Sequence, residues 1–290
     1  MNHVEAKILD GVAFLYPEIF SDLDSYCEKY KFYIDDAISV FDREIQFYIS
    51  YLDFISNLKE AGMNFCFPEI NDKSKDIYCY DSFDIALANR LCSEKAPVIL
   101  NDFYLKEKER IIIVSGPNQG GKTTFARMLG QLHYLSGLGC PVPGTSAQLF
   151  LFDNLLTHFE KEEDIKNLRG KLQDDLVRIH DILQKATENS VLILNEIFAS
   201  TTLQDQIYLS KHIMRKILKL DLICVWVTFI DELAVMNEKN VSMVSTVIPE
   251  NPAVRTCKII RGPANGLAYA ISIAEKYNLT YNRLQERLNK

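Results

Sequence analysis

One stretch, residues 110–124, constrains the fold of this 290-residue chain more than any other. It opens with the apolar, β-branched run 111–114, breaks at Gly116, and passes through residues 120–123, Gly-Gly-Lys-Thr, into a segment with helical periodicity. The pattern G-x-x-x-x-G-K-[ST] between a strand and a helix is typical of a phosphate-binding loop. Glycines permit the dihedral angles at which successive N–H groups point at one anion, and the helix N-terminus adds partial positive charge. The sequence therefore predicts a site for nucleotide phosphates.

The loop residues have distinct expected roles. Lys122 would reach the β- and γ-phosphates, and the Thr123 hydroxyl would ligate Mg²⁺. The other interpretation is a glycine-rich turn with a solvated lysine, but the spacing, the flanking elements and the Lys-Thr pair together favour a phosphate site. The residues expected to contact the nucleotide here are Gly116, Pro117, Asn118, Gln119, Gly120, Gly121, Lys122, Thr123 and Thr124.

A second segment with candidate catalytic residues is 190–196, where an apolar run ends in Asn195 and Glu196. Such a run predicts a central parallel strand that presents both side chains at its carboxyl end. By itself it would indicate only a buried strand with a solvated end. After a phosphate loop, however, this position carries the groups that orient Mg²⁺ and the attacking water. We therefore expect Glu196 to be the catalytic base and Thr123, Asn195 and Glu196 to face the metal, although the Asn195 amide contributes no charge.

Residues 97–105 form another extended run just upstream of the loop. Residues in this place commonly pack on the nucleotide base, so Val98, Ile99 and Asn101 are candidate adenine contacts. A role as core strand residues explains them equally well.

Composition limits the classes of partner. With a net charge of −7 and a pI near 5.4, the chain has the wrong sign to grip nucleic acid over a wide surface, so any DNA contact would be local or made by another chain. Seven cysteines without a C-x-x-C pair, and no signal peptide, indicate reduced thiols in a cytoplasmic protein. The most apolar stretch, residues 222–230, is too short to cross a bilayer, so no membrane partner is expected.

Two domains are expected, with a turn-rich boundary near residues 61–74. Residues 1–70 should form an α-helical stem, whose aromatic residues fit either burial against the neighbouring domain or a partner surface. Residues 71–290 alternate strands with helices, which predicts an α/β domain with a mostly parallel sheet covered on both faces. Expected strands are 77–80, 97–105, 111–114, 148–152, 190–194, 222–228, 241–248 and 255–261, and expected helices are 33–55, 83–92, 122–135, 165–183, 203–218, 267–277 and 281–288.

The expected helix 165–183 carries four charged residues that are typical of a solvated face, Lys171, Asp174, Asp175 and Arg178.

Several stretches together resemble the C-terminal ATPase domain of the MutS family of DNA mismatch-repair proteins, whose fold is the ABC type of P-loop NTPase. Residues 115–124, Ser-Gly-Pro-Asn-Gln-Gly-Gly-Lys-Thr-Thr, are similar to that family's T-G-P-N-M-G-G-K-S-T. Further similar stretches, in the family's order, are 139–143, 186–197, 228–233 and 266–274. The likeness covers roughly residues 95–280, and the first part of the chain resembles the end of the family's helical lever.

Some positions depart from the family pattern. By resemblance, Asn195 replaces an Asp, and Phe229 replaces a histidine thought to sense the γ-phosphate. The signature that reaches the partner's nucleotide falls on residues 167–172 and keeps only Arg169, while residues 198–202 replace G-R-G-T-S. These departures favour nucleotide binding over fast hydrolysis. A mismatch-reading domain is also expected to be absent from this sequence.

The resemblance implies a dimeric, ATP-gated conformational switch in DNA mismatch repair. Each ATP, with Mg²⁺, would be bound by one subunit's loop and touched by the partner's signature helix, and Lys122 and Glu196 would carry out hydrolysis. Two alternatives stay open. One is a nucleotide-binding regulatory or scaffold module with little hydrolysis, and the other is an ABC-type DNA-transaction protein outside mismatch repair.

Overall fold

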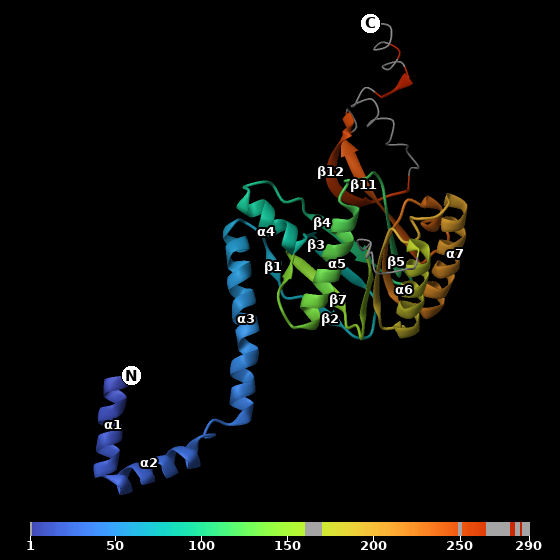
Figure 1. Ribbon diagram of the computed structural model, residues 1–290. Helices are drawn as coiled ribbons and strands as arrows, with labels where there is room; N and C mark the ends of the chain where they lie inside the picture. Colours follow the sequence, from blue (N-terminus) through green and yellow to red (C-terminus); the bar gives the residue numbers. More distant parts are fainter. Residues whose placement is uncertain (1, 160–169, 249–250, 265–278, 282–284, 286–290) are drawn as a thin grey trace. The chain divides into compact units, whose positions relative to one another are not determined.

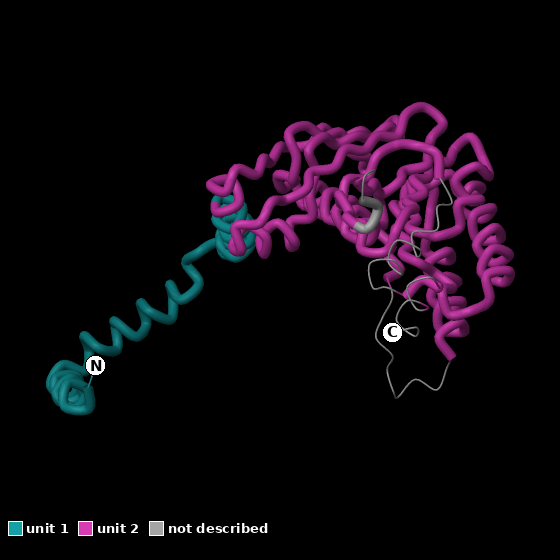
Figure 2. The backbone as a smooth tube through the Cα atoms, turned by 90° about the horizontal axis from the view of Figure 1, so that it is seen from above, with its two compact units in different colours: residues 1–56 teal, residues 57–290 magenta. Residues whose placement is uncertain are grey.

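The computed structural model (Figure 1) describes residues 2–159, 170–248, 251–264, 279–281 and 285. Arg169, the stretch 266–274 and the expected helix 267–277 lie outside these ranges, as does most of 281–288. The chain divides into two compact units, Met1–Ser56 and Asn57–Lys290 (Figure 2). Residues 57–70, expected in the stem, fall in the larger unit.

The smaller unit is helical, as expected. It contains α1 (His3–Leu15), α2 (Pro17–Tyr30) and most of α3 (Asp36–Glu60). A capping box fixes the start of α1: the Asn2 side chain accepts from the N–H groups of Val4 and Glu5, and the Glu5 carboxylate accepts from Asn2 N. Such a cap stabilises a helix by about 1 kcal/mol. The α2 helix begins with Pro17, whose missing N–H costs nothing in a first turn.

A six-stranded sheet in strand order β12-β11-β5-β10-β9-β8 forms the centre of the larger unit. Neighbours from β11 to β8 run parallel, and only β12 is antiparallel to its neighbour. The prediction of a mostly parallel sheet in an α/β domain is confirmed. The strands are β5 (Ile111–Ser115), β8 (Leu155–His158), β9 (Val191–Asn195), β10 (Ile223–Val227), β11 (Asn240–Ile248) and β12 (Asn251–Arg261).

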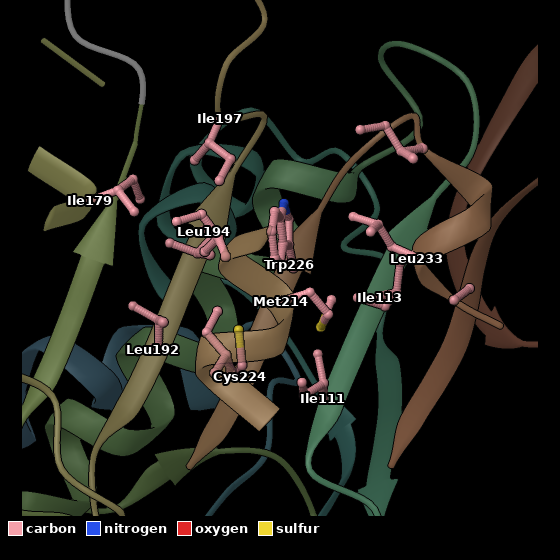
Figure 3. Packing of buried hydrophobic residues seen from close by; sticks show 14 of the residues in the cluster. Ile111, Ile113, Ile179, Leu192, Leu194, Ile197, Met214, Cys224, Trp226 and Leu233 are labelled. Carbon is pink, nitrogen blue, oxygen red and sulfur yellow. The ribbon is translucent and has the colours of Figure 1, made fainter. Parts of the chain in front are cut away.

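Helices cover both faces of this sheet. On one face α5 (Lys122–Gly137) contacts β9 and β10, and it comes so close that a Cβ at Gly130 would lie 2.8 Å from Ile193 Cδ1. On the other face, α6 (Lys171–Lys185) and α7 (Leu203–Leu220) supply side chains to a buried cluster around Trp226 (Figure 3). Burying each large apolar side chain stabilises the fold by about 1.5–3 kcal/mol. This packing fixes the strand ends that carry the candidate site.

A second, four-stranded sheet in order β2-β7-β3-β4 was not predicted as a separate layer. The expected strands at 77–80, 97–105 and 148–152 exist, but they pair with one another rather than with the main sheet. Residues 97–100 are not strand, because β4 begins at Asn101. The elements of this region are β1 (Phe65–Cys66), β2 (Glu69–Asn71), β3 (Ile77–Ser82), α4 (Ile85–Ser93), β4 (Asn101–Leu105), β6 (Val142–Pro143) and β7 (Ser146–Phe150), with β1 paired to β6.

Candidate functional site

The glycine-rich loop, residues 116–121, joins β5 to α5. Gly116 and Gly121 have φ angles of 121° and 86°, where glycine avoids the steric cost that other residues meet. Gln119 also has a positive φ, 60°. The loop turns back on itself, because Gly120 N donates to Pro117 O at 3.3 Å. The backbone N–H groups at the start of α5 thereby lie at the edge of the sheet.

The last two strands hold this loop in place. Ser245 Oγ of β11 donates to Gly120 O at 2.6 Å, and a Cβ at Gly120 would lie only 2.2 Å from that hydroxyl oxygen. From β12, Arg255 Nε donates to Asn118 O at 3.3 Å, and Cys257 Sγ lies 3.9 Å from Gln119 O. Glycine at position 120 is thus required by packing. Sequence patterns gave no signal for these contacts.

Three parallel strands end side by side at the loop. Val227 of β10 pairs with Val114 of β5 on one side and with Asn195 of β9 on the other. Directly after β9, Glu196 takes a left-handed conformation with φ 47°, and its N–H donates to Val227 O at 2.9 Å. This hydrogen bond holds the turn after β9 against the end of β10.

The structure brings together the four residues expected to act on phosphate and metal. Thr123 Oγ1 donates to Asn195 Oδ1 at 2.9 Å. Lys122 Nζ donates to Pro117 O at 3.1 Å and lies 3.7 Å from Glu196 Oε1. The Lys122 side chain is only 4% exposed, and burial lowers its pKa, while the Glu196 carboxylate opposes that shift. A buried ammonium group therefore lies between the loop and the end of β9.

An aromatic ring completes the surroundings of this ammonium group. Phe229, which follows β10, places its ring centroid 4.3 Å from Lys122 Nζ. At this distance the negative face of the ring attracts the cation.

A cavity of about 550 Å³ opens over the loop. Its size is in the usual range for small-molecule sites. It is lined by Asn118, Gln119, Gly120, Gly121, Lys122, Thr123, Thr124, Glu196 and Cys257. All but Cys257 of these residues were expected from the sequence, and a thiol on a distant strand could not have been.

The three candidate adenine contacts lie elsewhere. The cavity lining formed by described residues does not include Val98, Ile99 or Asn101. Asn101 is buried in β4, where its Oδ1 accepts from Ile259 N at 2.7 Å and its Nδ2 donates to Cys257 O at 3.3 Å. Its side chain therefore ties β4 to β12. Contact of these three residues with a base stays a prediction.

Asp175 of α6 supports the turn after β9, so the prediction that it lies on a solvated face is wrong. It is buried, and its Oδ2 accepts from Phe198 N at 3.2 Å while Oδ1 lies 3.2 Å from Nε2 of the buried His158. Burial alone would raise the pKa of Asp175, but His158, Phe198 N–H and Arg178 outweigh it and hold the pKa below its usual value. The carboxylate thus fixes the backbone two residues beyond Glu196.

Thr123 and Asn195 are the candidate metal contacts at this site. Within the described ranges, no three His, Cys, Asp or Glu side chains gather to hold a metal ion. The Thr123 and Asn195 oxygens are hard ligands of the kind Mg²⁺ prefers, and Mg²⁺ commonly completes its shell with substrate phosphates and water. In those same ranges, no helix is long and apolar enough to cross a membrane.

Comparison with known proteins decides the family. A family model described as MutS domain V matches residues 112–286. The chain belongs to the MutS family. The resemblance noted from the motifs is therefore confirmed, and the match to MutS domain V begins within β5 and includes the loop, Asn195 and Glu196.

Curated relatives agree with this MutS assignment. DNA mismatch repair protein MutS of Fervidobacterium nodosum is 26% identical over 285 residues, 94% of this chain and 33% of the relative. The protein of the same name from Halalkalibacterium halodurans is 30% identical over 183 residues, 61% of this chain and 21% of the relative. For Petrotoga mobilis the identity is 27% over 195 residues, 67% of this chain and 22% of the relative. The chain thus spans between a fifth and a third of the length of these relatives.

Proposed function

We propose that this chain binds ATP with Mg²⁺ and hydrolyses it, as an ABC-type P-loop ATPase domain. The observation that carries the proposal is that Lys122 and Thr123, in the first turn of α5, meet Glu196 and Asn195 at the end of β9 beside one cavity. Ligands of open parallel sheets bind at the carboxyl ends of the strands. Family membership supports the same function.

The residues present fit such a ligand. Glycine at positions 120 and 121 leaves that part of the cavity wall without side chains, so phosphate oxygens can approach the backbone N–H groups there. Lys122 supplies a positive charge with little solvent around it. Thr123 and Asn195 place two neutral oxygens 2.9 Å apart at the edge of the loop. This combination suits a polyphosphate that brings its own metal ion.

The reaction would be in-line attack of water on the γ-phosphate. Glu196 orients the water and accepts its proton while the water oxygen bonds to phosphorus and the bond to the leaving ADP breaks. Lys122 offsets the negative charge that spreads over the phosphate oxygens. When bound, Mg²⁺ would neutralise part of that charge, with Thr123 and Asn195 on the protein side.

Glu196→Gln tests hydrolysis, because it keeps the shape of the side chain and removes the base. We expect Mg²⁺-dependent phosphate release from the wild type, reduced about 10²- to 10⁴-fold in the variant, with ATP affinity retained. Glu238→Gln, at an exposed surface position, is the matched control and should hydrolyse like the wild type. Equal hydrolysis by the Glu196→Gln variant would exclude Glu196 as the base.

The larger assembly is also part of the proposal. Residues 1–56 would be the stem that corresponds to the end of the MutS lever, and residues 57–290 the unit that contains the ATPase domain. Two copies would face each other on binding ATP, so that the nucleotide state moves the stem. The mass of the Glu196→Gln protein in solution, with and without Mg·ATP, tests this, and a monomer at saturating ATP would contradict it.

The relatives are named DNA mismatch repair proteins, and we place this chain in the same process or a related DNA transaction, in the cytoplasm. DNA contact would be indirect or through another chain, since the net charge is −7. Binding assays at low salt with homoduplex, mismatched and branched DNA test direct contact. Tight binding of any of these DNAs by the chain alone would contradict the proposal that its DNA contact is indirect.

A second candidate function is a regulatory or scaffold module that binds ATP but scarcely hydrolyses it. Two observations favour it: Asn195 offers an amide where a carboxylate would attract Mg²⁺ more strongly, and Phe229 presents a ring without a hydrogen-bond donor. Single-turnover measurement with enzyme in excess separates the two functions. If bound ATP stays intact over hours, the chain is a regulatory or scaffold module and not an ATPase.

A further inference from the structure

The ring of Phe229 lies at a favourable distance for a cation–π contact with the Lys122 ammonium group. Its centroid is 4.3 Å from Lys122 Nζ, inside the roughly 6 Å over which a cation attracts an aromatic face. The attraction grows when the cation is desolvated, and the Lys122 side chain is only 4% exposed. Phe229 follows β10, which lies between β5 and β9 in the sheet. The ring is therefore carried by the middle one of the three strand ends that build the site.

The other neighbours of the ammonium group leave room for this contact. A lysine ammonium has three N–H donors. One points to Pro117 O at 3.1 Å, while Glu196 Oε1, at 3.7 Å, is beyond ordinary hydrogen-bond distance and acts mainly through its charge. The ring thus covers a cation for which burial has removed most of the water.

Packing alone does not account for the ring. Phe229 is 49% exposed, whereas its neighbours Thr228 and Ile230 are buried, and Ile230 N donates to Thr228 Oγ1 at 3.0 Å. The buried neighbours hold the turn, so the Phe229 side chain is not needed as a core anchor. A large aromatic side chain half in water is explained by the charge that it faces.

We propose that Phe229 is a positioning residue whose ring face holds the Lys122 ammonium group between the loop and Glu196, where it meets the phosphates. The inference rests on the proposed nucleotide site and deepens it. The requirement at position 229 is then an electron-rich ring, not a hydrogen-bond donor. Tyrosine should serve, and leucine, which has apolar bulk without a ring, should not.

Fluorinated phenylalanines test this, because they lower the negative charge of the ring face with little change of shape. Phenylalanine with one, two and three ring fluorines would be placed at position 229 of the full chain, beside Phe229→Tyr and Phe229→Leu. We expect the Kd for Mg·ATP to rise stepwise with fluorine number, reaching about threefold to tenfold for the trifluoro ring and for leucine. The tyrosine variant should stay within about twofold of the wild type.

The same fluorinated series at Phe32, which is 89% exposed, is the matched control and should leave the Kd unchanged. A Kd at position 229 that does not respond to fluorine overturns the inference, whether or not leucine weakens binding, because a space-filling role depends only on shape.

A second measurement separates failure of this inference from failure of the proposed function. NMR of the Lys122 side chain in the protein without nucleotide should show a ring-current shift of its terminal CH₂ protons in the wild type, kept in the fluorinated proteins and lost in Phe229→Leu. Absence of that difference overturns the inference. Absence of ATP binding by the wild type overturns the proposed function, and the NMR series still reports the ring contact.

Discussion

Thr123 Oγ1 donates a 2.9 Å hydrogen bond to Asn195 Oδ1, and this bond joins the first turn of α5 to the end of β9. The two residues come from different elements of the sheet and its covering helix, so the bond exists only in the folded domain. In the proposed function these two oxygens face the phosphate-bound metal ion. It also makes the identity of residue 195 matter, since an amide accepts this bond without adding charge.

Asn195→Asp should therefore strengthen metal binding. The carboxylate keeps the shape of the amide and can still accept from Thr123, but it adds a negative charge beside the metal position. We expect the Mg²⁺ concentration for half-maximal ATP hydrolysis to fall about tenfold. Asn195→Ala, which removes the acceptor, should raise it, and an unchanged Mg²⁺ requirement in both variants would show that residue 195 does not face the metal.

Gly120→Ala should weaken ATP binding through a clash. Its Cβ would lie 2.2 Å from Ser245 Oγ and 3.0 Å from Pro117 O, so the loop must shift. Overpacking of this kind predicts a Kd for ATP higher by about tenfold or more.

The double variant Gly120→Ala with Ser245→Gly should recover part of this loss, because the closest atom is removed and only the Pro117 contact persists. Coupling between the two positions is the expected signature of direct contact. The control is Gly11→Ala, where an added Cβ has no atom within 4 Å and ATP affinity should not change. Strictly additive effects of the two changes would contradict the account.

Asp175→Asn should destabilise the domain at neutral pH. The carboxylate accepts from Phe198 N and faces His158 in a buried position, so we expect a loss of about 1–3 kcal/mol in the free energy of unfolding at pH 7. Because the folded pKa of Asp175 lies below the usual 3.8, its charged form contributes stability above that pH. In the wild type this contribution is lost as the pH falls through the folded pKa.

Urea unfolding at pH 7 and at acid pH checks this prediction. The Asp175→Asn variant should lack the part of the acid sensitivity that Asp175 contributes. Asp181→Asn, at an exposed position on the same helix, is the matched control and should unfold like the wild type. Equal stability of the two variants at pH 7 would show that Asp175 does not stabilise the turn that contains Glu196.

His133 should make the fold sensitive to mild acid. Full burial lowers its pKa from 6.5 to about 4, although its contact with Leu129 O opposes the shift. As the pH falls from 6.5 to 4, the unfolded chain therefore binds a proton before the folded chain does, and stability is lost. We expect this residue alone to cost about 2 kcal/mol between pH 7 and pH 5.

The measurement is the difference in free energy of unfolding between pH 7 and pH 5, for the wild type and for His133→Leu. The variant should lose less stability over this interval by about that amount. His212→Leu, at an exposed position, controls for loss of a histidine and should keep the wild-type difference. Identical pH dependence in all three proteins would show that His133 titrates normally.

The elements that the sequence predicted well share long, uniform patterns. The runs that became β5, β9 and β10 are continuously apolar because both faces of a parallel sheet are covered, and the turn chemistry around Gly116 and Gly121 marks the loop by itself. Lys122, Thr123, Asn195 and Glu196 could be placed together in advance, because parallel strands end at the same edge of the sheet.

What could not be predicted depends on tertiary contacts. Strands β1 and β6 have two residues each, too few for any period to show. The hydrogen bond from Ser245 to Gly120 joins residues 125 apart in the sequence, and no local pattern predicts it. Asp175 looks like any charge on a helix surface until β8 and the turn after β9 cover it. Side chains that support a site are thus harder to find from sequence than those that act in it.

Binding of Mg·ATP by the Glu196→Gln protein, measured by calorimetry with and without the further change Lys122→Met, tests the central claim most directly. The account predicts one ATP per chain, and a loss of affinity of about 100-fold or more for Lys122→Met, because the buried ammonium group is the main charge facing the phosphates. Lys108→Met, at an exposed position, should bind like its parent. No measurable ATP binding, or binding that is indifferent to Lys122, would contradict the account.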